Sequence, residues 1–379
     1  PCLLLTAREY DRPQDLALWH ELRHNGKGDP SAGHCHELLS IPEMLWWDGS
    51  LPGKDVRDYK RPTAFIGRGK GVGVFRSSWK NEASCLVVLG QGRSHNIPDH
   101  THADAGHFSV FSRGELLAYD TAYFNFDEDV HSVVLIDDTP RHHTTQGNQY
   151  AGRFADDGRC DLLDWLTVDA AAAKGCMWAV RNVLFVRGAG DTCYAVILDN
   201  INRDNAVHNF KWQLQANMQC EIEVDARAHR AAVRGDAARL DCHFFSPLAQ
   251  DFPAAPHNLR VFTDQHEHKN ISTGTPETNP RLVAEQTGPN CTLMSLVIPR
   301  GTDAEPLEVT DDSTYRTFNI RVAHGDYVDQ IVYACDHIQV RLPNLHASSE
   351  VVVVRRDSSG RIVDTWSIDG KPVEAGPTG

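Results

Sequence analysis

The sequence lacks any apolar run long enough to cross a membrane, and it lacks a recognisable leader. No stretch of about 18 or more apolar residues occurs in the 379-residue chain. The first residues also lack the basic flank, the apolar block and the small-residue cleavage site of a secretory signal. We therefore expect no membrane span, and the sequence itself gives no cellular address.

Basic residues are also in short supply. The chain has 37 Lys and Arg against 51 Asp and Glu, a net charge of −14, which opposes non-specific attraction to nucleic acid. We therefore expect no nucleic-acid partner. Residues 60–113 are the exception, with eight basic against three acidic side chains. That local excess suits a pocket for an anion, and it equally suits basic side chains that only solubilise strand edges.

The ten cysteines lie far apart, and no CxxC pair occurs. This spacing excludes a zinc ribbon and a dithiol redox motif, and in a chain of this length it is not that of a disulfide scaffold. We expect most of the cysteines to be buried thiols, as in the apolar stretches around Cys85 and Cys193.

Helical patterns are scarce, and strand patterns fill most of the chain. Residues 12–50 contain two helix-like stretches, and residues 161–175 predict one further short helix. Later in the chain, short apolar stretches alternate with turn residues, as in HFSVFSRGELLAYD around Arg113 and Gly114. The pattern predicts a mainly β protein, a large antiparallel β-sandwich (super-sandwich) preceded by a short helical segment.

Glycines occupy positions 67, 69, 71 and 73. A phosphate-binding loop is excluded, because the order is not GxGxxG, no GK[ST] follows, and the next element is a strand rather than a helix whose N-terminus binds an anion. Glycines at every second position instead leave one strand face bare, so that a backbone, an aromatic ring or a ligand can approach closely.

Residues 99–108 read DHTHADAGHF, which places three histidines and two aspartates within ten positions. If the Arg-Gly pair of the following hairpin is a two-residue turn, residues whose numbers sum to 227 lie opposite each other, which pairs Asp120 with His107. The loop that carries His102 must then curl back toward Asp120, or His107 takes its place. His131 begins the next strand and returns to the same end of the sheet.

The spacing alone leaves three interpretations of these histidines open. Imidazole and carboxylate groups are zinc ligands, but a chain with 20 histidines contains some clusters by chance. The residues expected to be loop histidines or surface hydrogen-bond donors are His95, His107, His142 and His143. A third interpretation joins His102, Asp104 and one of the last two histidines into the two-His, one-carboxylate iron triad of oxygenases.

Three strings give a more specific signal. They are RSSW at 76–79, HTHADAGHFSVFSRGELLAYDTAY at 100–123 and VHSVVLIDD at 130–138. Together they resemble the C-terminal half of the heparinase II/III-like polysaccharide lyases, in which an HxHxDxxxF segment leads into a hairpin and a strand beginning with His-Asn follows. The likeness continues through RNVLFVRG, DNINRD, FKWQLQ and RLDCHFFSP, so it covers most of residues 60–247.

The resemblance implies a toroid of α-helices followed by an antiparallel β-sandwich, with residues 1–58 the remnant of the toroid and residues 59–379 the sandwich. It also implies a metal ion between strands, usually a structural zinc, although another divalent cation would suit the same ligands. The family's metal ligands match His102, Asp120 and His131. His100 matches a catalytic histidine that lines the cleft. Ser132 stands where the family mostly has Asn.

The activity implied by the resemblance is β-elimination in a uronic-acid-containing polysaccharide, heparin-like or alginate-like, in the periplasm or outside the cell. The family's base tyrosine and carboxylate-neutralising residue come from the toroid, which the same chain or a partner chain would have to supply. The side chains expected to meet the acidic sugar are Arg68, Arg76, Arg93 and Tyr123. The alternative is a non-catalytic carbohydrate-binding β-sandwich in which the ion is only structural.

Overall fold

The computed structural model describes residues 62–69, 71–90, 102–119, 127–140, 152–246, 259–269, 275–314, 317–335 and 339–375. The chain divides into two compact units, Pro1–Pro62 and Thr63–Gly379, and nearly all described residues belong to the second. The predicted helical segment, residues 1–58, lies outside the described residues. The domain boundary at residues 58 and 59 therefore stays a prediction.

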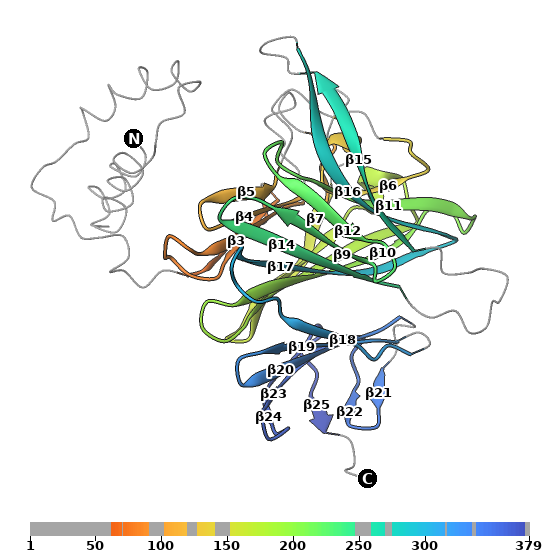
Figure 1. Ribbon diagram of the computed structural model, residues 1–379. Coiled ribbons are helices and arrows are strands. Elements are labelled where there is room, and N and C mark those ends of the chain that lie inside the picture. Colours follow the sequence, from red (N-terminus) through yellow and green to blue (C-terminus); the bar gives the residue numbers. More distant parts are fainter. Residues whose placement is uncertain are drawn as a thin grey trace, which may run out of the picture. The chain divides into compact units, whose positions relative to one another are not determined.

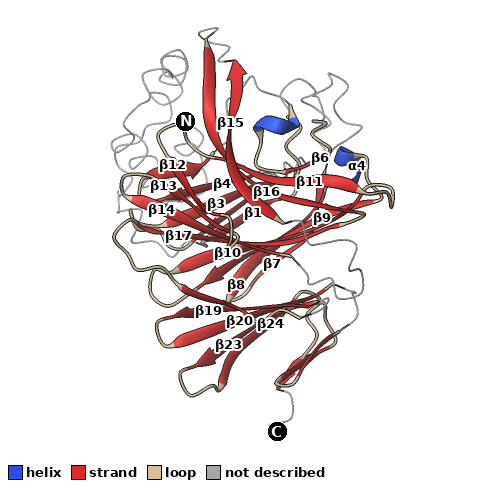
Figure 2. Ribbon diagram, turned by 45° about the vertical axis from the view of Figure 1, so that its right-hand side comes forward, coloured by secondary structure: helices blue, strands red, loops and turns tan. Residues whose placement is uncertain are grey.

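The described strands form five antiparallel sheets (Figures 1 and 2). The N-terminal sheet has the order β1-β2-β3-β4-β5, with β1 Ala64–Gly67, β2 Val72–Arg76, β3 Ser84–Leu89, β4 Phe108–Ser112 and β5 Glu115–Ala118. The central sheet has the order β12-β13-β14-β17-β10-β9-β8-β7, with β7 Arg153–Arg159, β8 Leu163–Asp169, β9 Trp178–Arg187, β10 Cys193–Asn202, β12 Glu221–Asp225, β13 Arg230–Arg234, β14 Ala238–Phe245 and β17 Cys291–Gly301.

The other three sheets are smaller. The hairpin sheet has the order β15-β16-β11-β6, with β6 Val134–Ile136, β11 His208–Gln215, β15 Arg260–Lys269 and β16 Pro276–Gly288. The C-terminal sheet has the order β18-β19-β20-β23-β24, with β18 Glu308–Asp311, β19 Thr317–His324, β20 Tyr327–Ala334, β23 Val351–Asp357 and β24 Ile362–Ser367. The small sheet joins β21 Val340–Leu342, β22 Leu345–Ala347 and β25 Val373–Ala375. The described helical pieces are η3 Glu128–Val130 and α4 Ala171–Lys174.

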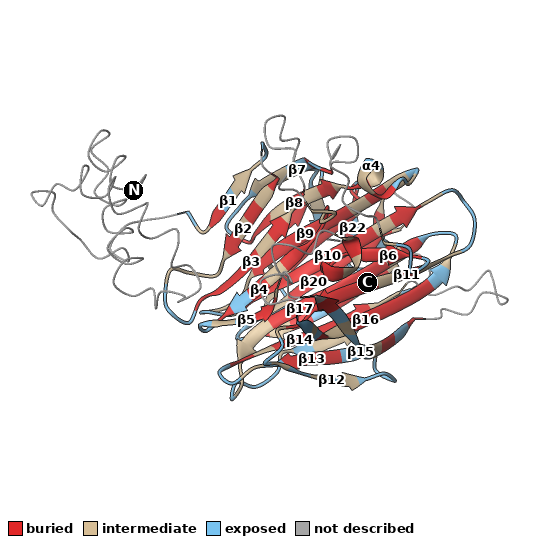
Figure 3. Cartoon of the chain, turned by 90° about the horizontal axis from the view of Figure 1, so that it is seen from above, coloured by how far each residue is buried: buried red, intermediate tan, exposed pale blue. Residues whose placement is uncertain are grey.

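The middle strands of the central sheet are buried on both faces, and buried residues follow one another along β9 and β10 (Figure 3). Because side chains alternate along a strand, Ala195 and Ile197 of β10 enter the core shared with the N-terminal and hairpin sheets. Val196 and Leu198 enter the core shared with the C-terminal sheet. A third core, which includes Val352 of β23, lies between the C-terminal and small sheets. This layering confirms the predicted super-sandwich.

The short helix predicted for residues 161–175 is mostly wrong. Residues Leu163–Asp169 form strand β8, and only Ala171–Lys174 form helix α4. Leu163 packs in the core of the C-terminal sheet, whereas Leu166 packs in the opposite core. A strand buried on both faces has the apolar content of a buried helix, so the sequence pattern did not separate the two.

The hairpin predicted around Arg113 and Gly114 is confirmed. Both residues have positive φ, 51° and 86°, as a type I′ turn requires. The pairs next to the turn are Ser112 with Glu115 and Phe111 with Leu116, and a β-bulge then places Val110 opposite Ala118. Because the bulge shifts the register by one residue, the rule that paired Asp120 with His107 fails after the second pair.

Gly73 accounts for part of the glycine pattern. A Cβ atom at this position would lie 2.4 Å from Cδ2 of Leu166 in the central sheet. The absence of a side chain at Gly73 therefore lets β2 approach Leu166 of the central sheet closely. The predicted single bare strand face is wrong, because Gly67 belongs to β1 and both Gly69 and Gly71 lie in the turn between β1 and β2.

The described cysteines are free thiols, and Cys85 and Cys193 are buried as predicted. Burial raises the pKa of the Cys193 thiol to about 12, so this thiol is protonated at neutral pH and packs as a small apolar group. In the described part of the chain, no helix has the length and apolar character needed to cross a membrane.

Candidate metal centre

Two loops from different sheets bring His102 and His131 together. The His102 loop (residues 102–107) leads into β4 of the N-terminal sheet, and Gly106 N–H donates to the carbonyl of Leu89 at 2.7 Å. The His131 loop (residues 131–133) follows η3 and leads into β6 of the hairpin sheet. The two imidazole centroids are 5.2 Å apart, with 39° between the ring planes.

The two rings fit a shared zinc ion in donor type and spacing. Tetrahedral zinc with Zn–N bonds of about 2.0–2.1 Å places the centres of two imidazole ligands roughly 5 Å apart. The third predicted ligand, Asp120, lies outside the described residues. Among the residues that are described, no group of three or more His, Cys, Asp or Glu side chains is gathered closely enough to hold a metal ion. The three-ligand site therefore stays a prediction.

His107 is buried beside His131 and is engaged in hydrogen bonds. The two ring centroids are 5.5 Å apart. The backbone N–H of Ser132 donates to Nδ1 of His107 at 2.9 Å, and Nε2 lies 2.9 Å from Oγ of Ser109. Because Nδ1 accepts, Nε2 has the proton and donates to the serine. His107 is thus a hydrogen-bonded loop histidine, one of the two positions predicted for it, but it is buried rather than at the surface. Because both its nitrogens bind protein groups, it does not take the place of His102.

Two glutamines of β11 donate hydrogen bonds to the backbone around His131. Gln213 Nε2 donates to the carbonyl of His131 at 2.6 Å, and Gln215 Nε2 donates to the carbonyl of Asp129 at 2.9 Å. The backbone N–H of Gln215 also donates to Oγ of Ser132 at 3.1 Å. Both glutamines are buried. Their role was not predicted from the sequence, although two glutamines flanking a leucine in an apolar strand were a visible signal.

A buried ion pair fixes the helical turn before His131. Lys174 Nζ donates to the carboxylate of Glu128 in η3 and to the carbonyl of Val134 at 2.8 Å. The side chains of Lys174 and Glu128 are 6% and 7% exposed. Removal of either partner would leave an uncompensated buried charge, so the pair ties η3 to α4.

Arg68 and Arg76 contact side chains other than the two histidines. Arg68 forms an ion pair with Asp157 at 2.6 Å, and the Arg76 guanidinium lies 4.7 Å from the centroid of the Trp79 ring. Arg76 lies at the end of β2 away from the strand end that the His102 loop meets. The remaining predicted positions outside the described residues are His95, His100, Arg93, Tyr123, His142 and His143.

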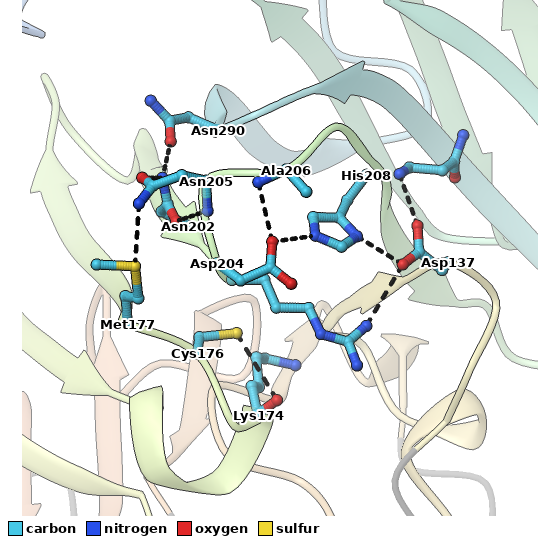
Figure 4. A network of polar contacts seen from close by, with 12 residues as sticks. Asp137, Lys174, Cys176, Met177, Asn202, Asp204, Asn205, Ala206, His208 and Asn290 are labelled. Atoms are coloured by element: carbon cyan, nitrogen blue, oxygen red, sulfur yellow. Dashed lines mark hydrogen bonds and ion pairs between the residues drawn. The ribbon is translucent and has the colours of Figure 1, made fainter.

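The strand that follows the His131 loop ends in a charged network (Figure 4). Asp137 directly follows β6, and its carboxylate accepts hydrogen bonds from His208 Nδ1 at 2.7 Å and from the backbone N–H of Asn209 at 2.9 Å. Arg203 donates to the same carboxylate at 3.3 Å. His208 Nε2 lies 2.8 Å from Oδ1 of Asp204. The imidazole therefore bridges two carboxylates, which favours its protonated form.

We expect this bridge to lose its stabilising effect as the pH rises. Hydrogen bonds to Asp204 and then to Asp137 raise the pKa of His208 above its ordinary value. The contribution is full below about pH 6.5, the usual histidine value, and is lost as the pH passes through the raised pKa. His208→Gln should therefore flatten the fall of melting temperature as the pH rises above about 6.5. Equal slopes in thermal melts of the two proteins would contradict the bridge.

The described fold is similar to that of two solved lyases. Heparan sulfate lyase HepC from Pedobacter heparinus matches with a TM-score of 0.55 and 15% identity, over 80% of this chain and 47% of its own. A heparinase III structure matches with a TM-score of 0.53 and 13% identity, over 76% of this chain and 44% of its own. No protein-family model matches the sequence, and a search of curated proteins finds no match.

These similarities show the fold, which is that of the β-sandwich part of the two lyases. They confirm, at the level of fold, the resemblance carried by the strings between residues 76 and 138. The chain spans less than half the length of either solved structure. Activity, substrate and partners are therefore matters for proposal.

Proposed function

We propose that this chain is the β-sandwich portion of a lyase that cleaves a uronic-acid-containing polysaccharide by β-elimination. The observation that carries the proposal is the approach of His102 and His131 to 5.2 Å between ring centroids, within a fold similar to that of heparan sulfate lyase HepC. The same two residues match metal ligands in the sequence resemblance.

β-Elimination at a uronate has three requirements. The C6 carboxylate must be neutralised so that the C5 proton becomes acidic, a base must remove that proton, and an acid must protonate the C4 oxygen as the C4–O bond breaks and the C4–C5 double bond forms. A tyrosine whose pKa is lowered by nearby cations can transfer these protons, with help from a histidine. In the proposal, the toroid supplies the tyrosine and the neutralising residue, and the sandwich supplies His100.

His102, Asp120 and His131 would hold the zinc ion. A bound zinc ion supplies a cross-link between the two loops and orients their neighbours, and no proton passes through it. His100, two positions before His102, would thereby be held at the cleft. Arg68, Arg93 and Tyr123 are proposed contacts of the sugar.

The activity is tested with the complete gene product and a panel of acidic polysaccharides. We expect at least one uronate polymer, heparin-like or alginate-like, to give the ultraviolet absorbance of an unsaturated uronate product. Binding of a polymer without any such product would contradict the lyase and favour the non-catalytic carbohydrate-binding alternative.

His100→Ala should lower the elimination rate without loss of metal or fold. A positioned acid–base group contributes about 10²- to 10⁴-fold to a rate, and we expect a loss in that range. Zinc content and melting temperature should equal those of the wild type. His346→Ala on the exposed face of β22 is the matched control and should keep full activity. Wild-type activity in His100→Ala would contradict the catalytic role.

A further inference from the structure

Arg181 contacts both histidine-bearing loops at once. From β9 its NH1 donates to the carbonyl of Gly106 at 2.5 Å and to the carbonyl of Ser132 at 3.2 Å. Gly106 belongs to the His102 loop, and Ser132 directly follows His131. We propose that Arg181 is a positioning residue that clamps the two loops together and so sets the distance between the two imidazoles.

Asp199 fixes the other edge of the same guanidinium. Nε and NH2 of Arg181 donate to Oδ1 and Oδ2 of Asp199 at 2.7 and 3.0 Å, and the two residues lie directly opposite each other in β9 and β10. Their side chains are only 5% and 2% exposed. The carboxylate neutralises the buried charge and holds the plane of the guanidinium, which leaves NH1 directed at the loops.

The His102 loop is shaped to reach this guanidinium. Gly106 has a φ of +89°, a conformation that glycine adopts at little cost and other residues avoid. That backbone conformation presents the Gly106 carbonyl to NH1. Two residues later, the Phe108 ring centroid lies 5.7 Å from the guanidinium carbon of Arg181, close enough for a cation–π interaction. The loop therefore contacts Arg181 through backbone and side chain.

The chemistry requires arginine at this position. A lysine would keep the charge, but an ammonium has no planar fork with which to bind both oxygens of Asp199 and still reach two loop carbonyls. Arg181→Lys should therefore loosen the loops without removing the charge. The clamp itself does not depend on a metal, and only its effect on metal affinity rests on the proposed function.

A second buried pair provides a matched control. Arg355 donates to Oδ1 and Oδ2 of Asp329 at 2.7 and 2.8 Å and to the carbonyl of Arg187 at 2.5 Å. This pair joins the C-terminal sheet to the end of β9, and the hydrogen bonds of Arg355 go to Asp329 and Arg187 rather than to either histidine loop. Arg355→Lys is thus the same chemical change in a similar environment.

The test compares wild type, Arg181→Lys and Arg355→Lys in two measurements. In metal-free protein, we expect Arg181→Lys to speed amide hydrogen exchange in the His102 and His131 loops, whereas Arg355→Lys leaves exchange in these loops unchanged. In a chelator competition with zinc, Arg181→Lys should bind about 10- to 100-fold more weakly than the wild type, the usual effect of a residue that supports metal ligands. Arg355→Lys should bind as tightly as the wild type.

The outcomes separate the clamp from the metal site. Unchanged loop exchange in Arg181→Lys, or equal acceleration in both variants, would overturn the clamp. Faster loop exchange only in Arg181→Lys, together with a wild type that does not bind zinc, would support the clamp and overturn the proposed metal site. Unchanged zinc affinity in Arg181→Lys would overturn the role of the clamp in metal binding.

Discussion

His102→Ala is expected to abolish tight zinc binding and to lower the melting temperature of the zinc-loaded protein. An ion that binds only the folded state stabilises it by about 2.7 kcal/mol at a free concentration of 100 times Kd, and loss of an imidazole ligand should remove most of that stabilisation. Metal analysis after dialysis, followed by thermal melts with and without added zinc, measures both effects.

Metal-free wild type is the control that separates a ligand from a packing residue. His102 is partly exposed, whereas His131 is fully buried, so alanine at position 102 disturbs the core less than alanine at position 131. In the presence of a chelator, His102→Ala and the wild type should melt at the same temperature. A variant that keeps its zinc, or that melts lower than the chelated wild type, would contradict the ligand assignment.

Asp329→Ala is expected to cost about 3–5 kcal/mol of unfolding free energy, as breaking a buried ion pair does. The fully buried carboxylate accepts hydrogen bonds from Arg355 and from Tyr194, both at 2.7 Å, and lies 2.8 Å from Nε2 of His324. Burial acts to raise the pKa of Asp329, but the hydrogen bonds from Arg355 and His324 outweigh it and hold the pKa below its ordinary value. Without Asp329 the guanidinium of Arg355, whose side chain is only 13% exposed, loses its counter-charge.

Asp191→Ala is the matched control for this prediction. Asp191 forms an ion pair with Lys80 at 3.0 Å, and both side chains are more than half exposed, at 54% and 63%. Exposed pairs of this kind contribute about 0–1 kcal/mol. Chemical denaturation should therefore show that Asp329→Ala loses several-fold more unfolding free energy than Asp191→Ala. Equal losses of unfolding free energy would show that the Asp329 network stabilises the fold no more than a surface ion pair does.

The alternation of short apolar stretches with turn residues predicted most of the strands of the sandwich. The Arg113-Gly114 turn follows from a glycine, which tolerates positive φ, next to a polar residue between two apolar stretches, and the central strands follow from their β-branched content. The bulge between Val110 and Phe111 was not predictable, because a one-residue irregularity depends on how the neighbouring sheets pack. Strand β8 was not predicted for a related reason. Both of its faces pack against neighbouring sheets, so its apolar residues do not alternate with polar ones as in a strand with one exposed face.

The candidate site was predictable only in part. Spacing left the role of the DHTHADAGHF stretch open, and the family resemblance was needed to join His102 with His131. The pairing of Arg181 with Asp199 could have been predicted from the sequence, because both are charged residues in apolar strands on either side of the turn at residues 188–192, and hairpin pairing across this turn places them opposite each other. The contacts of Arg181 with the two loops could not have been predicted, because these contacts depend on the path of two loops that belong to different sheets.

The central claim is that two imidazoles and one carboxylate bind the same ion, and X-ray absorption at the zinc edge of the purified protein tests it most directly. We expect nitrogen and oxygen ligands at about 2.0–2.2 Å with the scattering pattern of two imidazole rings. In any zinc that His102→Ala retains, we expect the pattern of one ring. Sulfur ligands at about 2.3 Å, or a protein that binds no zinc, would contradict the central claim.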